Sequence, residues 1–236
     1  PEEAAVPVSS EETPVPAPSE ETTVPAPSSG KVYPTEDPAV IAAQHAIYIT
    51  FDDGPSAATS YVLDVLDQYG IKACFFVTFQ PEFEQMYREI VNRGHMIGVH
   101  SSTHDYEQIY ASFDAWQADF RQVYDYVIYL TGVTPVLYRF PGGSQSDSLS
   151  EKLRNQIINY LHSIGVEYYD WNVDSCDSYE VISEQEILEN SLDGLKGRKV
   201  PILLMHDGEA QLDTIKALPS VLSEIQNLGY VFKRLD

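Results

Sequence analysis

The sequence predicts an α/β fold, a distorted (β/α)7 barrel that resembles a TIM barrel. A disordered N-terminal spacer is predicted to precede it. Short apolar runs alternate with amphipathic stretches from about Val40 to the end of the chain, as parallel β/α units require. Seven such runs occur, which is enough strands to close or nearly close a barrel. The pattern does not decide closure, so an open doubly wound sheet remains the alternative.

The individual elements follow from the two periodicities of the apolar residues. The predicted strands are Ala46–Phe51, Ala73–Thr78, Met96–His100, Leu137–Phe140, Val166–Trp171, Ile202–His206 and Val231–Arg234. The predicted helices are Ala57–Tyr69, Phe83–Arg93, Phe113–Leu130, Ser150–Ser163, Glu184–Leu195 and Asp213–Leu228. Every predicted strand except the last is therefore followed by a predicted helix.

Residues 1–39 form the predicted spacer, and residues 40–236 form the predicted folded domain. Residues 1–30 are rich in Pro, Glu, Ser and Thr, contain Val-Pro-Ala-Pro-Ser twice and lack aromatic residues. Such a segment buries too little apolar surface to offset the entropy that it would lose on ordering. Spacers of this kind often tether extracellular domains to a surface, and a plain tail is the other interpretation. We expect an extracellular or cell-surface protein.

The composition excludes several classes of partner. A formal net charge of -22 opposes binding to nucleic acid or to an anionic membrane surface and favours a neutral or cationic substrate. No apolar run approaches the roughly 20 residues of a transmembrane helix. The two cysteines, Cys74 and Cys176, form neither a disulfide framework nor a paired metal motif, and Cys74 is expected to be a buried thiol. We expect a monomer.

Polar side chains gather where the predicted strands end. The carboxyl ends of parallel strands share one rim of a barrel or one edge of a sheet, and active sites form there. The residues at or near these ends are Asp52, Asp53, His100, Arg139, Asp170, Asp174 and His206. We therefore expect a single site at this rim.

Asp52 and Asp53 allow a division of labour. The segment Asp52-Asp53-Gly54-Pro55 suits any tight turn after a strand, and a simple turn is its plainest interpretation. Successive residues that leave a strand point in different directions, however. One carboxylate can therefore bind a metal while the other acts as a base.

His100 and His104 have the i, i+4 spacing that brings two imidazoles to one face where the backbone turns helical. A polar loop with one capping histidine is the alternative. Together with Asp53, the two histidines give three protein ligands and room for water, which is the arrangement of a catalytic zinc-type site.

Five short segments occur in order along the chain. They are Thr50-Phe51-Asp52-Asp53-Gly54, His100-Ser101-Ser102-Thr103-His104, Arg139-Phe140-Pro141-Gly142-Gly143, Asp174-Ser175-Cys176-Asp177 and Leu204-Met205-His206. Together they resemble the sequential motifs of the polysaccharide deacetylase family, also called carbohydrate esterase family 4 or the NodB homology domain. The resemblance extends from about Ile47 to the end of the chain, and it is nearest to the bacterial peptidoglycan deacetylases.

The resemblance implies a distorted barrel of about seven strands and the hydrolytic removal of acetyl groups, with one divalent ion bound. Zinc is the expected ion, and cobalt, nickel and manganese are the alternatives. The implied general base is Asp52, which Arg139 would hold in place. The implied general acid is His206, which Asp177 would orient, with Asp174 as the alternative partner. The implied metal ligands are Asp53, His100 and His104.

The substrate pocket departs from the family pattern. Many members have Trp directly after the fourth-motif Asp, where this chain has Ser178, and we expect Trp171 and Leu204 to form the pocket wall instead. Pro141 and Gly142 are also expected at the substrate. A glycine there lets the substrate approach closely, and a backbone N–H can donate to an oxyanion.

The resulting hypothesis is a metal-dependent polysaccharide N-deacetylase, with residues 40–236 as its catalytic domain. It would remove acetyl groups from N-acetylglucosamine-type units of a cell-wall polysaccharide, peptidoglycan first, and release acetate. One alternative is an O-acetyl (xylan) esterase on the same scaffold. Another is a catalytically silent carbohydrate-binding domain, which the intact set of acid, base and ligands argues against.

Overall fold

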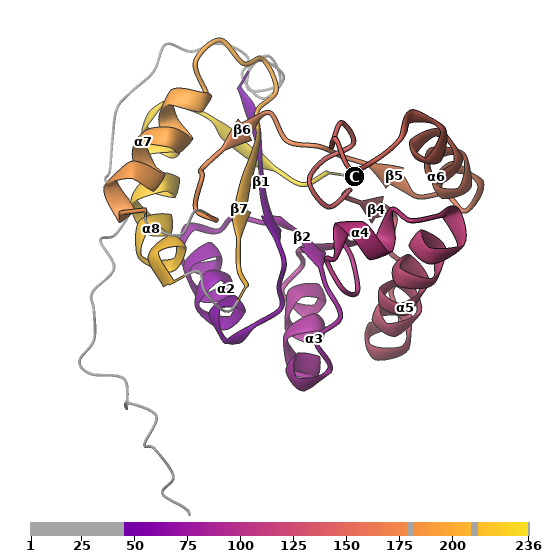
Figure 1. Ribbon diagram of the computed structural model, residues 1–236. Coiled ribbons are helices and arrows are strands. Elements are labelled where there is room, and N and C mark those ends of the chain that lie inside the picture. Colours follow the sequence, from indigo (N-terminus) through magenta and orange to yellow (C-terminus); the bar gives the residue numbers. More distant parts are fainter. Residues whose placement is uncertain (1–44, 179–181, 209–211, 236) are drawn as a thin grey trace, which may run out of the picture.

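The computed structural model describes residues 45–178, 182–208 and 212–235 (Figure 1). The predicted spacer, residues 1–39, lies outside these ranges, as do the first five residues of the predicted domain. Within the described part of the chain, no helix is both long enough and apolar enough to cross a membrane.

The strands form one parallel sheet with the spatial order β5-β4-β3-β2-β1-β7-β6, and β8 pairs with the first half of β1. The strands are β1 (Ala46–Asp52), β2 (Cys74–Val77), β3 (Met96–Val99), β4 (Leu137–Tyr138), β5 (Glu167–Tyr168), β6 (Val173–Asp174), β7 (Ile202–His206) and β8 (Val231–Lys233). Apart from β8, this order follows the chain cyclically, as strands do around a barrel, whereas a doubly wound sheet reverses at a switch point. The predicted distorted β/α barrel is confirmed.

The barrel is open between β5 and β6, since no pairing joins these two strands within the described residues. The backbone N–H of Tyr169 still bonds to Tyr138 next to β4, whereas that of Asn172 already bonds to Ile202 on β7. The chain therefore crosses the opening within three residues. The predicted strand Val166–Trp171 is too long for this reason, because its apolar run contains the crossing as well as a two-residue strand.

Helices cover the outer face of the sheet, and α7 and α8 pack against each other (Figure 1). The helices are α2 (Ala57–Tyr69), α3 (Glu84–Asn92), α4 (Tyr106–Ile109), α5 (Phe113–Thr131), α6 (Glu151–Ser163), α7 (Glu184–Gly194) and α8 (Leu212–Asn227), with a 3₁₀ turn at Pro81–Phe83. The six predicted helices are confirmed, and their ends differ by no more than a residue. The sequence did not predict α4 or the 3₁₀ turn, because a single turn carries too little periodicity.

Serine residues fix where several of these helices begin. The side chains of Ser56, Ser112, Ser150 and Ser183 each accept a backbone N–H from the first turn of the helix that follows. Such a cap satisfies a donor that has no partner inside the helix and is worth about 1 kcal/mol. Helices α2, α5, α6 and α7 therefore start at defined positions next to the rim where the strands end.

Side chains alternate between the two faces of each strand. On β1, Ile47, Ile49 and Phe51 pack beneath the helices. Tyr48 instead packs against a small inner cluster, and Thr50 bonds to Arg139. The inner cluster contains Cys74, Phe76, Leu137 and Leu235, so the expected burial of Cys74 is confirmed. The same alternation turns Asp52, the last residue of β1, inward at the carboxyl end of the barrel.

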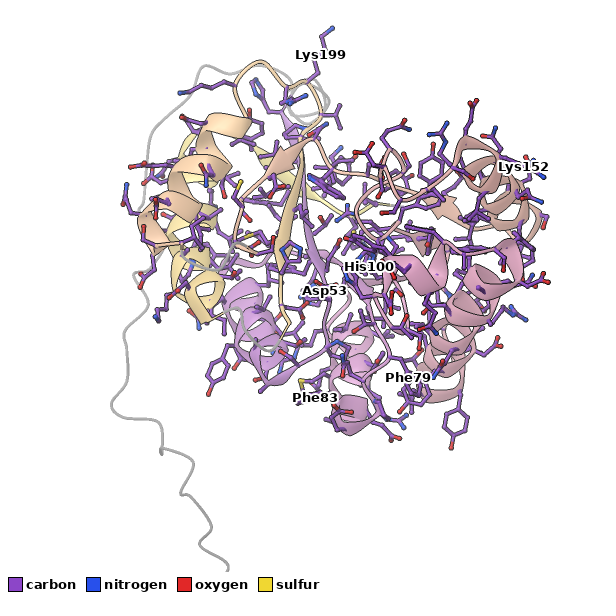
Figure 2. The ribbon with its side chains drawn as sticks, in the orientation of Figure 1. Asp53, Phe79, Phe83, His100, Lys152 and Lys199 are labelled. Atoms are coloured by element: carbon purple, nitrogen blue, oxygen red, sulfur yellow. The ribbon has the colours of Figure 1, made fainter. Side chains whose placement is uncertain are left out.

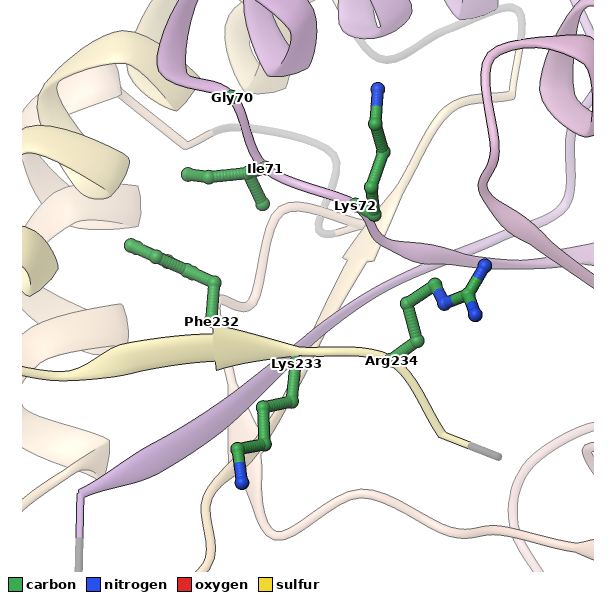
Figure 3. Close-up of a pocket in the computed structure, with 6 residues that line it drawn as sticks. All are labelled: Gly70, Ile71, Lys72, Phe232, Lys233 and Arg234. Atoms are coloured by element: carbon green, nitrogen blue, oxygen red, sulfur yellow. The ribbon is translucent and has the colours of Figure 1, made fainter. Parts of the chain in front are cut away.

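A cavity of about 440 Å³ lies at the opposite end of the barrel (Figure 3). It is lined by Gly70, Ile71, Lys72, Phe232, Lys233 and Arg234. Lys72 precedes β2, and β8 pairs with the start of β1, which places this cavity at the amino ends of the strands. None of the residues predicted at the catalytic rim lines it.

Candidate active site

Four of the predicted residues lie at the carboxyl ends of four strands of the sheet. Asp52 ends β1 and is paired in register with His206 at the end of β7. His100 follows β3, and Arg139 follows β4. All four residues are buried, and Figure 2 shows the side chain of His100 near that of Asp53 in the middle of the molecule. The predicted rim site is therefore one continuous cluster.

Asp52 and Arg139 form a buried ion pair. Oδ1 of Asp52 accepts a hydrogen bond from a guanidinium N–H of Arg139 at 2.9 Å, and neither side chain is more than 3% exposed. Arg139 also donates to the hydroxyl of Thr50 and to the carbonyl of Tyr169, and its guanidinium lies 4.1 Å from the centre of the Phe76 ring. These contacts hold the cation in place, so Arg139 fixes the position of the carboxylate, as the resemblance implied.

Asp53, His100 and His104 converge on one point. One ligand atom from each residue lies within 4.8 Å of the other two. Oδ1 of Asp53 is 3.5 Å from Nε2 of His100 and 3.6 Å from Nε2 of His104. This oxygen is buried and has no hydrogen-bond partner among the described residues. A buried acceptor without a partner is costly, and a cation bound between the three residues would satisfy it.

The orientation of His100 also suits a metal ligand. Its Nδ1 lies 2.8 Å from the carbonyl oxygen of Arg139. A carbonyl only accepts, so Nδ1 donates this bond, and Nε2 is the nitrogen that faces Asp53 and is left to bind a metal. Burial lowers the pKa of His104 and the neighbouring His100 adds to this, although Asp53 and Asp52 oppose it. Both imidazoles are thus suited to bind as neutral ligands, and one carboxylate with two imidazoles fits a catalytic divalent-metal site.

The helical interpretation of the His100–His104 segment is wrong. His100 follows strand β3, and His104 has a left-handed φ of 53°, so the chain between them forms a loop. The two rings nevertheless come within 5.2 Å of each other, centre to centre. The i, i+4 spacing therefore predicted two imidazoles that do lie together, but a loop rather than a helix brings them there.

Asp119 on α5 holds this loop in shape. Its carboxylate accepts the hydroxyl of Ser101, the backbone N–H of Ser102, and both the N–H and the hydroxyl of Thr103, at distances of 2.8 to 3.0 Å. Ser101 in turn accepts the backbone N–H of His104 at 2.9 Å. Asp119 therefore positions the second histidine through the loop, and no pattern in the sequence predicted this role.

His206 and Asp177 form the second buried pair of the site. Nδ1 of His206 donates to Oδ1 of Asp177 at 2.7 Å, and Oδ2 accepts the hydroxyl of Thr214 at 2.6 Å. Burial lowers the pKa of His206, but the hydrogen bond and charge of Asp177, with the charges of Asp52 and Asp53, outweigh burial and raise this pKa to about 9. An imidazolium at this position can donate a proton at neutral pH.

Asp174, the other candidate partner of His206, bonds to the backbone of Cys176 instead. Asp174 accepts the backbone N–H of Cys176 at 2.8 Å and so stabilises the turn in which Cys176 has a left-handed φ of 58°. That turn brings Asp177, rather than Asp174, to His206. Leu204 is buried two residues before His206 on β7, on the same inward face.

The loop after β4 packs against Asp170 and Trp171 beside the site. Asp170 accepts the backbone N–H of Ser144 at 2.9 Å and its hydroxyl at 2.5 Å, which fixes the end of the loop. Gly143, with a φ of 83°, packs against Trp171, because an added Cβ would lie 3.4 Å from the indole ring. Trp171 is half-buried and packs on the loop that contains Gly142. Asp170 was predicted at the rim, without a role of its own.

Gly142 and Pro141 lie where the loop meets α4. Gly142 is exposed and has a left-handed φ of 74°. A Cβ at this position would lie 3.1 Å from the hydroxyl oxygen of Tyr106. Pro141 is buried, and its carbonyl accepts the hydroxyl of Tyr110 at 2.8 Å. Tyr106 was not predicted at the site, because α4 itself was not predicted.

Asp207 is a further buried carboxyl group of the site that the sequence analysis missed. Its Oδ2 accepts the hydroxyl of Thr59 at 2.6 Å, and its backbone carbonyl accepts the hydroxyl of Ser56. A Cβ on Gly54 would lie 2.3 Å from Oδ1 of Asp207, so only glycine fits between this carboxyl group and the metal-ligand turn. Asp207 thus links the turn after Asp53 to the end of β7.

Comparisons with known proteins agree with this geometry. Residues 40–161 match the family model of the polysaccharide deacetylases. The putative polysaccharide deacetylase YheN of Bacillus subtilis is 32% identical over 197 residues, which cover 80% of this chain and 67% of that protein. The peptidoglycan-N-acetylglucosamine deacetylase of Bacillus cereus is 30% identical over 193 residues, which cover 79% of this chain and 67% of that protein.

The solved structures include a similar catalytic domain. That domain, from the peptidoglycan N-acetylglucosamine deacetylase of Eubacterium rectale, superposes with a TM-score of 0.77 at 34% identity, covering 89% of this chain and 93% of that chain. The chain therefore belongs to the polysaccharide deacetylase family, carbohydrate esterase family 4.

Proposed function

We propose that the protein is a metal-dependent N-deacetylase that removes acetyl groups from N-acetylglucosamine-type units of peptidoglycan, at the cell surface or outside the cell. The observation that carries the proposal is that two buried charged pairs, Asp52 with Arg139 and His206 with Asp177, adjoin one cluster of three ligands. Such a site has a base, an acid and a place for a cation within one rim.

Hydrolysis of an acetamide needs an activated water, a stabilised oxyanion and a proton for the leaving nitrogen. A divalent ion held by Asp53, His100 and His104 would lower the pKa of bound water towards about 7 and polarise the acetyl carbonyl. Asp52 would accept the proton of the attacking water. Its Oδ2 is 3.8 Å from Nε2 of His100, so the base would act directly beside the ligands.

His206 would protonate the leaving nitrogen. Its pKa is raised to about 9, chiefly because the bond to Asp177 outweighs the effect of burial, so it keeps its proton at neutral pH. The backbone N–H of Gly142 has no acceptor among the described residues and would donate to the oxyanion.

Two further observations support the choice of substrate. Two of the relatives named above are peptidoglycan N-acetylglucosamine deacetylases. The net charge of -22 suits an uncharged amino-sugar substrate better than a polyanion. An O-acetyl esterase would use the same base and ligands, so the two activities must be separated by experiment.

The test is acetate release from purified peptidoglycan, N-acetylated chitooligosaccharides and acetylated xylan, each with and without a chelator. We expect release from the N-acetylated substrates, loss of release with the chelator and recovery when zinc is added back. Release from xylan alone would assign the esterase instead. No release from any substrate by the zinc-loaded protein would indicate a silent carbohydrate-binding domain.

A further inference from the structure

We propose that the hydroxyl of Tyr106 is a further catalytic group, which donates a hydrogen bond to the acyl oxygen of the substrate beside the N–H of Gly142. Tyr106 is the first residue of α4 and belongs to none of the five motifs. This inference rests on the proposed function and adds to it a second donor from the protein.

Tyr106 lies directly beside a proposed metal ligand. Its ring centre is 5.3 Å from that of His104, at an interplanar angle of 50°. It also stacks on Tyr110, at 6.2 Å between ring centres and 30° between planes. Because the hydroxyl of Tyr110 bonds to the carbonyl of Pro141, the two tyrosines connect α4 to the loop that contains Gly142. Two aromatic neighbours thus hold the ring of Tyr106 in position.

The hydroxyl of Tyr106 also lies over Gly142. A Cβ on Gly142 would come within 3.1 Å of this oxygen and 3.2 Å of the ring carbon that bears it. The hydroxyl therefore occupies the space into which any larger side chain at residue 142 would extend. Among the described residues, neither this hydroxyl nor the N–H of Gly142 has a hydrogen-bond partner. Two donors without partners thus meet next to the ligand cluster.

Such a pair of donors is suited to a developing negative charge. A phenol hydroxyl carries one O–H donor, and a backbone N–H carries another, so both can point at the same oxygen. Donors aimed at an oxyanion act mainly in the transition state, and removal of one costs about 100-fold or more in kcat. A contact made only in the transition state changes kcat and leaves KM nearly unaltered.

The test is Tyr106→Phe, compared with Tyr126→Phe as a matched control. The first substitution removes a hydroxyl with no described hydrogen bond. The second removes a hydroxyl that bonds to Glu84 on the outer surface, at 3.3 Å. For Tyr106→Phe we expect a fall of about 100-fold in kcat, a KM within about twofold of the wild type and an unchanged zinc content. For Tyr126→Phe we expect wild-type values. An unchanged kcat for Tyr106→Phe, or a change in KM alone, would overturn the assignment.

A binding measurement separates this inference from the proposed function. Acetohydroxamate binds metals as an anion, so its oxygen carries negative charge as the oxyanion of the transition state does, and its affinity for the zinc-loaded protein is measured without turnover. We expect Tyr106→Phe to bind it about tenfold more weakly than the wild type, the usual worth of about one hydrogen bond. If the wild type released no acetate, weaker binding by Tyr106→Phe would still support the donor, and equal binding would refute it.

Discussion

Asp177 holds His206 through both of its carboxylate oxygens. Oδ1 accepts the ring Nδ1–H of His206 at 2.7 Å, and Oδ2 accepts the backbone N–H of the same residue at 2.8 Å. One side chain therefore fixes both the ring orientation and the tautomer, and it leaves Nε2 as the nitrogen that can transfer a proton. The same contact is the main reason that the pKa of His206 is raised despite burial.

Asp177→Asn tests this relationship. An amide keeps the shape but loses the negative charge, so the pKa of His206 falls and less imidazolium is present at neutral pH. We expect kcat to fall by about 100-fold or more and the alkaline limb of the profile of kcat against pH to move to lower pH. Asp174→Asn is the control, since Asp174 bonds to the N–H of Cys176 instead. An alkaline limb that stayed in place would argue against His206 as the acid.

Asp52→Asn and His104→Ala separate the base from the ligands. Asp52 is paired with Arg139, whereas the cluster of three ligand atoms consists of Asp53, His100 and His104. We therefore expect Asp52→Asn to abolish turnover while zinc stays bound, and His104→Ala to lose both. Zinc content is measured alongside acetate release. Undiminished activity of Asp52→Asn would refute the role of Asp52 as the general base.

Arg139→Met tests the buried ion pair through stability. The substitution leaves the carboxylate of Asp52 buried without its cation, and this typically costs about 3–5 kcal/mol. We expect the free energy of unfolding, measured in urea, to fall by that amount. The control is Arg121→Met, which removes an exposed pair with Asp125 and should cost less than about 1 kcal/mol. Equal losses of unfolding free energy in the two variants would mean that the buried pair contributes no more to stability than the exposed pair.

Asp119→Asn tests how the metal-ligand loop is held. The amide offers one acceptor oxygen where the carboxylate offers two, so some of the donors from Ser101, Ser102 and Thr103 lose their partner. Removal of such supporting contacts usually weakens metal binding by about 10- to 100-fold. We expect this loss in a zinc titration, and no change for Asp125→Asn on the same helix. Unaltered zinc affinity would show that the loop keeps its shape without Asp119.

The sequence predicted the residues at the strand ends because short apolar runs mark where each strand stops, and the carboxyl ends of parallel strands share one rim. Asp52, His100, Arg139 and His206 each end such a buried run or follow it directly, so their convergence needed only the order of the strands. The contacts of Asp119 could not be predicted in this way. They join α5 to a loop, and no periodic pattern relates the two segments.

The choice between Asp174 and Asp177 as partner of His206 shows a second limit of prediction from the sequence. Both residues lie at or just after the two-residue strand β6, and each is spaced suitably for a partner of His206. The decision depends on the backbone of Cys176, whose φ of 58° turns the chain so that Asp177 reaches the histidine. A left-handed residue other than glycine or asparagine leaves little trace in a sequence.

Asp207 is the group whose titration should be visible in the stability of the metal-free protein. Burial raises its pKa to about 7, and the charges of Asp53 and Asp52 add to this, while the bond from Thr59 and the charge of His206 oppose it. In the unfolded chain the same carboxyl titrates near 3.8. Between these two values the folded state binds more protons than the unfolded state, so stability falls as pH rises through this window.

Asp207→Asn removes this dependence, because an amide does not ionise and can still accept the hydroxyl of Thr59. Unfolding in urea at about pH 5 and about pH 7.5 gives the stability of the variant relative to the wild type at each pH, and other groups that titrate, His206 among them, largely cancel in this difference. We expect the variant to gain relative stability at the higher pH. A difference that did not change with pH would mean that Asp207 titrates in the folded protein as it does in the unfolded chain.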